Sequence, residues 1–279
     1  MADTALVLGG GAAVGGAWAA GVLAGLSEAG IDVARADVVI GTSAGAVLGS
    51  RLASGISAAE LYERQLSGAE AINIAVTLGQ TARFLWAALG SRNPQRSIER
   101  LGRAALAART GPESDVFAAV GTLLGDVRDW PERELRITAV DARTGSLEVF
   151  DAGSGPTLLE AVAASCAVPV VWPPVTVAGR RWMDGGSRST TNICLARGHR
   201  RIVALSLIPD AVGPHPSAPQ EAAALAADGA RITVLAPDRT ARRAMGRNMV
   251  DDSRRSAAAR AGHAQATALA ESVAEVWHG

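Results

Sequence analysis

Two short apolar runs near the start of the chain each lead, through a loop of small residues, directly into a helical stretch. The first run covers residues 5–8 and is followed by a predicted helix over about 14–29. The second run covers residues 38–40 and is followed by a helix of small residues that ends near Ala53. Because successive strand–loop–helix units place their strands parallel in one sheet, this pattern predicts a fold of the α/β class.

Residues 57–125 show helical periodicity and no convincing strand, and we interpret them as a helical insert. The insert begins with the capping-box pattern of Ser57 and Glu60. Within it, residues 72–89 are unusually apolar. We interpret this stretch as a core helix, with a lipid-facing helix as the alternative.

Further strands are predicted in the second half of the chain, two of them joined in a hairpin by a turn at Gly145. The predicted strands are 135–140, 147–150, 175–177, 181–183, 202–208 and 232–235; the predicted helices are 157–167 and 241–277, and 209–219 is a predicted surface loop. No internal repeat and no break in composition marks a second unit. We therefore expect a single domain over residues 1–279, with a mainly parallel central sheet flanked by helices on both faces.

The charged residues and cysteines exclude several classes of function. Lys+Arg and Asp+Glu number 27 each, and this formal net charge of zero lacks the basic footprint of a nucleic-acid binder. Every basic residue is an arginine, which excludes Schiff bases, Ser–Lys dyads and lysine-containing phosphate loops. Two cysteines are too few for a disulfide scaffold or a four-cysteine zinc site, and a reducing, cytoplasmic setting is expected.

The uncharged stretches 4–27 and 161–179 are interrupted by glycines and prolines respectively, so neither is predicted to be a signal peptide or a membrane span.

The sequence Gly-Thr-Ser-Ala-Gly at positions 41–45 lies between the second predicted strand and its helix. A turn of this kind strains the backbone of its serine and projects the hydroxyl, and it needs small neighbours because the chain approaches itself closely. Gly41, Ala44 and Gly45 are such neighbours. Ser43 is therefore the predicted nucleophile, held in an elbow by Gly41 and Gly45.

A second loop, Gly9-Gly10-Gly11-Ala12, also joins a strand to a helix, where backbone N–H groups and the helix dipole favour an anion. A dinucleotide-binding loop is not favoured, because Ala12 stands where the middle glycine of that motif belongs. A Walker loop would need a lysine. The interpretation that uses both loops is an oxyanion hole, in which N–H groups of Gly10, Gly11 and Ala12 face Ser43.

A nucleophilic serine also needs a base. The four histidines each fit a surface position in the sequence: His199, His215, His263 and His278. Asp184 differs from them, because it follows a predicted strand and opens a tight loop with Gly185 and Gly186. A carboxylate can act as the base when it is hydrogen-bonded to the serine hydroxyl and partly desolvated.

These residues together resemble the patatin-like phospholipase family. The glycine-rich loop, the elbow at Ser43 and the Asp184-Gly185-Gly186 triplet stand in the order of that family, and the likeness covers nearly the whole chain apart from the insert. It extends through Pro173-Pro174 and Asn192. The resemblance implies a patatin-like fold, Ser43 as nucleophile, Asp184 as the general base of a Ser–Asp dyad, and residues 9–12 as the oxyanion hole.

The function implied by the resemblance is serine-dependent hydrolysis of an acyl-ester lipid, with no cofactor, and the sequence offers no ligand set for a metal. The family usually carries a basic residue just after the oxyanion glycines, where this chain has Ala13 and Val14.

Two alternatives stay open: a Ser-His-Asp esterase of the α/β-hydrolase type that uses His199 or His215, and a catalytically degenerate lipid-binding module. Cys166 is interpreted as a buried structural thiol in preference to an acyl-pocket residue. Peripheral contact with a membrane and the oligomeric state are left open.

Overall fold

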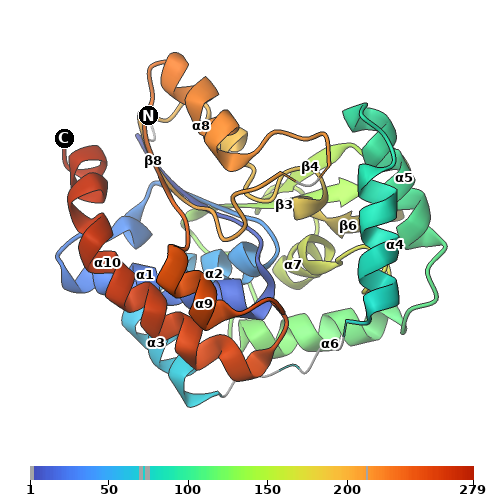
Figure 1. Cartoon of the computed structure of the whole chain (residues 1–279), viewed down its shortest axis with the longest axis horizontal. Coiled ribbons are helices and arrows are strands. Elements are labelled where there is room, and N and C mark those ends of the chain that lie inside the picture. Colours follow the sequence, from blue (N-terminus) through green and yellow to red (C-terminus); the bar gives the residue numbers. More distant parts are fainter. Residues whose placement is uncertain (1–2, 69–71, 73–75, 212) are drawn as a thin grey trace.

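A computed structural model describes residues 3–68, 72, 76–211 and 213–279 of the chain. In this part of the chain a sheet of eight strands lies between helices, so the predicted mixed α/β fold with a central sheet is confirmed (Figure 1). Five strands run parallel in the order β3-β2-β1-β7-β8. They are β1 (Thr4–Leu8), β2 (Val38–Gly41), β3 (Glu134–Asp141), β7 (Arg201–Leu205) and β8 (Arg231–Leu235).

The other three strands form an antiparallel extension on β3. They are β4 (Leu147–Phe150), β5 (Val175–Val177) and β6 (Arg180–Asp184). β4 pairs with β3 in the predicted hairpin, whose turn contains Gly145 at φ 73°. β6 pairs with both β3 and β5, and its last residue, Asp184, lies opposite Ala139 of β3. This antiparallel register brings the Asp184 carboxylate to the middle of the sheet, on a strand that runs opposite to the five parallel strands.

Alternate residues of the central strands face two different layers of helices. Leu6 and Leu8 of β1 belong to the larger core cluster, whereas Ala5 and Val7 belong to a second cluster on the other face. The larger cluster is covered by α1 (Ala12–Glu28), α2 (Ala44–Ala53), α3 (Ala58–Ser67), α6 (Glu113–Leu124), α7 (Leu158–Cys166), α9 (Arg239–Met245) and α10 (Arg255–Trp277). α8 (Ala218–Ala227) covers the second. Burial on both faces explains the nearly continuous apolar runs of these strands.

Helices α1 and α10 pack with their backbones almost in contact, and Figure 1 shows α10 crossing in front of α1. A Cβ atom on Gly21 would lie 2.0 Å from the carbonyl oxygen of Ala259, and one on Gly262 would lie 2.2 Å from that of Trp18. Only glycine allows so close an approach. The Trp18 indole N–H donates to Gln265 Oε1 at 2.9 Å, which adds a polar contact to the same helix pair.

The segment after α2 is helical as predicted, with α4 (Leu78–Leu89) and α5 (Pro94–Leu106) between α3 and α6. Ser57 caps α3 by accepting a hydrogen bond from the Glu60 N–H. The core-helix interpretation of 72–89 is wrong for the outer face of α4, where four large hydrophobic residues are exposed: Leu78, Leu85, Trp86 and Leu89. Residues 73–75 of that stretch lie outside the described residues.

Two departures from the predicted elements occur in the C-terminal part. α8 begins at Ala218, within the end of the predicted 209–219 loop, and was not predicted. The predicted helix 241–277 is divided into α9 and α10 at Gly246, whose φ of 74° interrupts the helix. None of the helices in the described part is both long and apolar enough to cross a bilayer.

Candidate active site

Ser43 lies between β2 and α2 with φ 54° and ψ −119°, a strained conformation for a residue with a side chain. Its flanking glycines permit this turn. A Cβ on Gly41 would lie 2.6 Å from the Cα of Ala46, and one on Gly45 would lie 2.0 Å from the carbonyl oxygen of Leu8. The Ser43 N–H donates to the Ser165 hydroxyl at 2.8 Å, which fixes the elbow against α7. The hydroxyl of Ser43 is thus presented from a rigid turn into a cavity.

Asp184 ends β6 and is 5% exposed. Burial raises the pKa of its carboxyl to about 6, against the opposing effect of hydrogen bonds from the Ser43 side chain and the Gly186 N–H. The Gly186 N–H donates to Asp184 Oδ1 at 2.7 Å. Gly185 has to be small, since a Cβ there would lie 2.2 Å from Thr138 Oγ1. Asp184 and Ser43, which are far apart in the sequence, therefore share one buried site.

The glycine-rich loop 9–12 lies beside them, but its four N–H groups are not equivalent. The N–H of Gly9 donates to the Leu205 carbonyl at 3.0 Å, and the N–H of Gly10 donates to the Thr190 carbonyl at 2.7 Å. No described residue accepts a hydrogen bond from the N–H of Gly11 or Ala12, which begin α1. Ala12 also has a positive φ of 51°. Only the second half of the predicted loop thus presents N–H groups that are available to a ligand.

A buried polar network joins the elbow to the loop after β6. The hydroxyls of Thr42 and Thr138 share a hydrogen bond of 2.8 Å. The side-chain N–H₂ of Asn192 donates to Thr42 Oγ1 at 3.0 Å and to the Ser189 carbonyl at 2.8 Å, from a left-handed residue with φ 57°. Sequence reasoning named Asn192 only within the family resemblance and missed Thr138, because a hydroxyl in the middle of a strand has no distinctive pattern.

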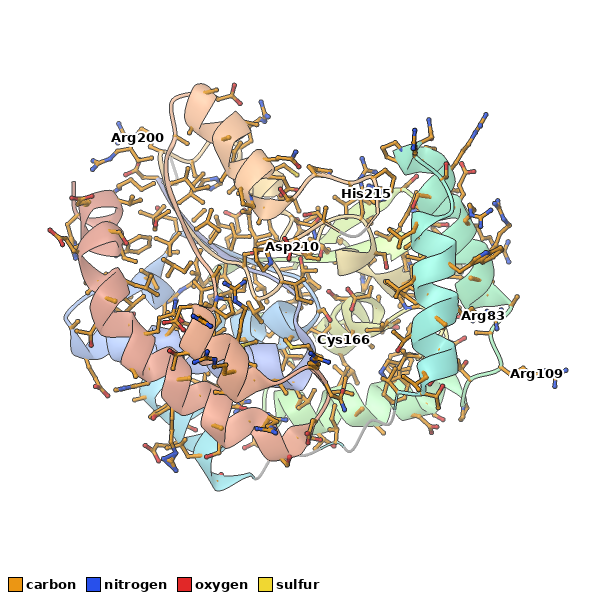
Figure 2. The ribbon with its side chains drawn as sticks, in the orientation of Figure 1. Arg83, Arg109, Cys166, Arg200, Asp210 and His215 are labelled. Carbon is orange, nitrogen blue, oxygen red and sulfur yellow. The ribbon has the colours of Figure 1, made fainter. Side chains whose placement is uncertain are left out.

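Cys166 lies in the cavity wall and interacts with the Ser43 side chain. It is the last residue of α7 and lies near the middle of the molecule in Figure 2. Burial and the charge of Asp184 raise the pKa of the Cys166 thiol far above its usual value, so the thiol stays protonated and is a poor nucleophile. The Cys166 thiol is thus unreactive, as expected of a structural thiol, but it also lines the cavity, which the sequence analysis did not favour.

The cavity has a volume of about 340 Å³, and Ser43 is one of its lining residues. Most of its wall is apolar, as is usual for sites that bind small organic ligands. α2, α4 and α6 each contribute to it, through Val47 and Leu48, Phe84, and Val120 and Leu123 respectively. Three long polar residues also line it: Arg51, Gln65 and Arg255.

Two of the four histidines depart from the predicted surface positions, whereas His278 is exposed as predicted. His199 and His215 are buried, so their interpretation as surface residues is wrong. The neighbouring carbonyl of Ala196 lies 3.0 Å from His199 Nδ1, and His263 Nε2 lies 3.0 Å from Glu28 Oε2. In the part of the chain that the structure describes, no histidine lines the cavity.

The fold and the site together define an α/β protein with a strained serine and a buried carboxylate on an apolar cavity. A family model described as patatin-like phospholipase matches residues 6–196. The chain therefore belongs to the patatin-like phospholipase family, as the sequence motifs predicted.

Among solved structures, the type III effector protein ExoU is similar to this chain, with 18% identity and a TM-score of 0.43 over 98% of this chain and 54% of that one. VipD from Legionella pneumophila is similar with 15% identity and a TM-score of 0.37, over 66% of this chain and 46% of that one. The chain thus spans about half the length of these two proteins. A comparison with curated proteins finds no significant match.

Proposed function

We propose that this chain hydrolyses the acyl ester of a lipid, with Ser43 as the nucleophile and Asp184 as the general base. The observation that carries the proposal is a strained serine whose hydroxyl interacts with a buried carboxylate of raised pKa, both in the wall of an apolar cavity. A carboxyl with a pKa of about 6 is mostly ionised at neutral pH and is a stronger base than an exposed one. Family membership supports the same reaction class.

In the proposed reaction, Asp184 accepts the proton of the Ser43 hydroxyl as its Oγ attacks the ester carbonyl. The resulting oxyanion accepts hydrogen bonds from the N–H groups of Gly11 and Ala12 at the start of α1. Collapse of the tetrahedral intermediate breaks the ester bond, and Asp184 returns the proton to the leaving alcohol. Asp184 then deprotonates a water molecule whose oxygen attacks the acyl-serine ester; the bond to Ser43 Oγ breaks, Asp184 returns the proton to that oxygen, and the acyl group leaves as a carboxylic acid.

The N–H of Ala44 is a further donor that the sequence analysis did not include. Ala44 follows the nucleophile, lines the cavity and begins α2, and no described residue accepts a hydrogen bond from its N–H. In other serine hydrolases the residue after the nucleophile supplies one oxyanion donor. We therefore include Ala44 with Gly11 and Ala12, and assign Gly9 and Gly10 the role of holding the loop in place.

The test is labelling with a fluorophosphonate probe, followed by hydrolysis of short p-nitrophenyl esters. Ser43→Ala is expected to abolish both, since the site contains no other activated nucleophile. Ser50→Ala is the matched control, because Ser50 is a buried serine on the same helix whose hydroxyl donates to the Ala46 carbonyl. It should retain both properties. A folded wild-type chain that the probe does not label at Ser43 would instead support the degenerate binding module.

A further inference from the structure

The large exposed hydrophobic residues of the described chain are confined to two adjacent helices. Four lie on α4, namely Leu78 (90% exposed), Leu85 (47%), Trp86 (70%) and Leu89 (63%), and Leu106 (39%) ends α5. We call these five residues the α4–α5 face. Figure 1 shows α4 and α5 next to each other at one edge of the molecule. Scattered exposed apolar residues are ordinary, whereas a cluster of this kind marks an interaction site.

The four residues on α4 share one side of that helix. They lie seven, eight and eleven residues after Leu78, and at 100° per residue the four positions fall within a sector of about 100° of the helix surface. The opposite side of α4 is covered, since Ala87 and Ala88 are buried and Phe84 lines the cavity. α4 therefore separates the cavity from an exposed apolar surface.

The segment that carries this face is strongly basic. Residues 78–109 contain six arginines and a single acidic residue, Glu99, which gives a formal charge of +5. Because the whole chain is neutral, the remainder carries −5. The arginines are Arg83, Arg92, Arg96, Arg100, Arg103 and Arg109. The net charge of the whole chain is zero, but this segment alone is strongly basic.

The arginines lie close to the apolar residues. The guanidinium carbon of Arg100 lies 4.5 Å from the ring centre of Trp86, in a cation–π contact. Arg96 and Arg103 are exposed and stand at i and i+7 on α5. In Figure 2, Arg83 and Arg109 lie at the edge of the molecule formed by α4. An apolar stripe beside arginines is the composition of surfaces that insert shallowly between anionic head groups.

We propose that the α4–α5 face docks the protein on the surface of an anionic phospholipid bilayer. The leucines and Trp86 enter the boundary between head groups and acyl chains, while the arginines pair with the phosphates. Docking places the bilayer against the outer side of α4, whose inner side is a wall of the cavity. The proposal rests on the proposed function for its purpose, but the docking itself can be measured without turnover.

A second copy of the chain is the main competing occupant. In a two-fold symmetric dimer each α4–α5 face would meet the same face of its partner. Two segments of charge +5 would then be brought together, and such like-charge contacts oppose association. An anionic bilayer has the complementary charge.

The experiment uses the full chain with Ser43→Ala, so that no lipid is consumed. Binding is measured by flotation with vesicles of phosphatidylcholine mixed with phosphatidylglycerol, and with vesicles of phosphatidylcholine alone. We expect binding to the anionic vesicles that weakens in high salt, because salt shortens the range of the electrostatic attraction. Leu85→Ser combined with Trp86→Ser should reduce this binding by about tenfold or more. Trp86→Phe is the conservative control and should retain most of it.

A second pair of variants tests the charge separately. Arg103→Gln with Arg109→Gln should weaken binding by roughly tenfold, the order expected when two basic residues are removed from an anionic surface. The matched control is Arg197→Gln with Arg200→Gln; Arg200 lies at the opposite edge of the molecule in Figure 2. These exposed arginines pair with Asp228 and Asp3. The control should bind the vesicles as the parent does.

Equal binding to neutral and anionic vesicles, or equal losses in the two arginine pairs, would overturn the proposal. The proposal would also be overturned if the chain does not bind vesicles and instead forms a dimer that dissociates when Trp86→Ser is introduced. If the chain with Ser43 intact hydrolyses short esters but does not bind anionic vesicles, docking fails and the proposed function stands. If the chain binds anionic vesicles but hydrolyses no ester, docking stands and the proposed function fails.

Discussion

The Ser43 elbow and helix α4 both line the cavity, but their residues are held in place in different ways. At the elbow, backbone packs against backbone: Gly45 of α2 meets the carbonyl of Leu8 in β1, and Asn192 bonds to Thr42. α4 has only its inner side covered, and its outer side carries Leu78 and Trp86 in solvent. The proposed chemistry therefore rests on the rigid region, and the proposed membrane contact rests on the exposed region.

Glycine-to-alanine changes in the two regions give the largest expected contrast. Gly45→Ala would place a Cβ 2.0 Å from the Leu8 carbonyl oxygen, and backbone on both sides leaves no simple relief. We expect a loss of more than about 4 kcal/mol in unfolding free energy, or no folded protein. Gly79→Ala on α4 meets nothing nearer than 3.9 Å, so it should stabilise the helix by about 0.5–1 kcal/mol. Urea unfolding measures both, and equal effects would remove the contrast.

The next effect is on the rate. Asp184→Asn should lower turnover of short esters by at least about 10²-fold, because the amide accepts no proton from Ser43. In the unmodified chain the rate should fall as the pH drops through about 6, where the Asp184 carboxyl becomes protonated. His199→Ala and His215→Ala should stay within a few-fold of wild type in the folded protein. An active Asp184→Asn together with a dead histidine variant would establish the triad esterase instead.

The same Asp184→Asn variant has an opposite expected effect on stability. The folded-state pKa of about 6 exceeds the reference value of 3.8, so the folded chain keeps a proton that the unfolded chain releases between these pH values. The stability of the unmodified chain should therefore fall as the pH rises from about 4 to 6. Above pH 6 the variant should be more stable by about 3 kcal/mol, the equivalent of that pKa difference. The gain should vanish below about pH 4.

Asparagine-to-alanine changes in the two regions give the smallest expected difference in turnover and stability. Asn192→Ala removes the hydrogen bond to Thr42, and we expect turnover to fall by about tenfold as the elbow loses one support. Asn93→Ala removes the cap of α5, where the Asn93 side chain accepts from the Arg96 N–H at 3.0 Å. That change should lower the unfolding free energy by about 1 kcal/mol and leave turnover of a short soluble ester unchanged. Loss of turnover in Asn93→Ala alone would show that the two regions are coupled.

Sequence reasoning predicted the local structure best where one short segment determines it. The strand–loop–helix units around residues 9–12 and 41–45 follow from small residues placed at sharp turns, and both are found. The sequence indicated Asp184 through its tight loop and through the likeness to a family, but it did not show that Asp184 lies beside Ser43, because the register of β6 on β3 cannot be read from either strand alone. The partners of the Gly9 and Gly10 N–H groups are equally remote in sequence.

Helix α4 shows a different limit of prediction from sequence. The apolar character of residues 78–89 predicts a helix correctly, but not which of its sides is covered. Burial depends on whether another element packs there, and in the described part Leu78 and Trp86 remain largely exposed, with only the Arg100 side chain over the Trp86 ring. α8 was not predicted because its start, at Ala218, falls in a proline-containing stretch that is typical of a loop.

The position of β7 in the sheet has a consequence for the order of folding during synthesis. β1 lies between β2 and β7, and Thr4 of β1 pairs with Arg201 of β7. The Gly9 N–H likewise finds its acceptor only in Leu205. Contacts between such distant parts of a chain form late and slowly. Ser43 and the glycine-rich loop are therefore synthesised well before β7, and the sheet that supports them can close only once β7 has been made.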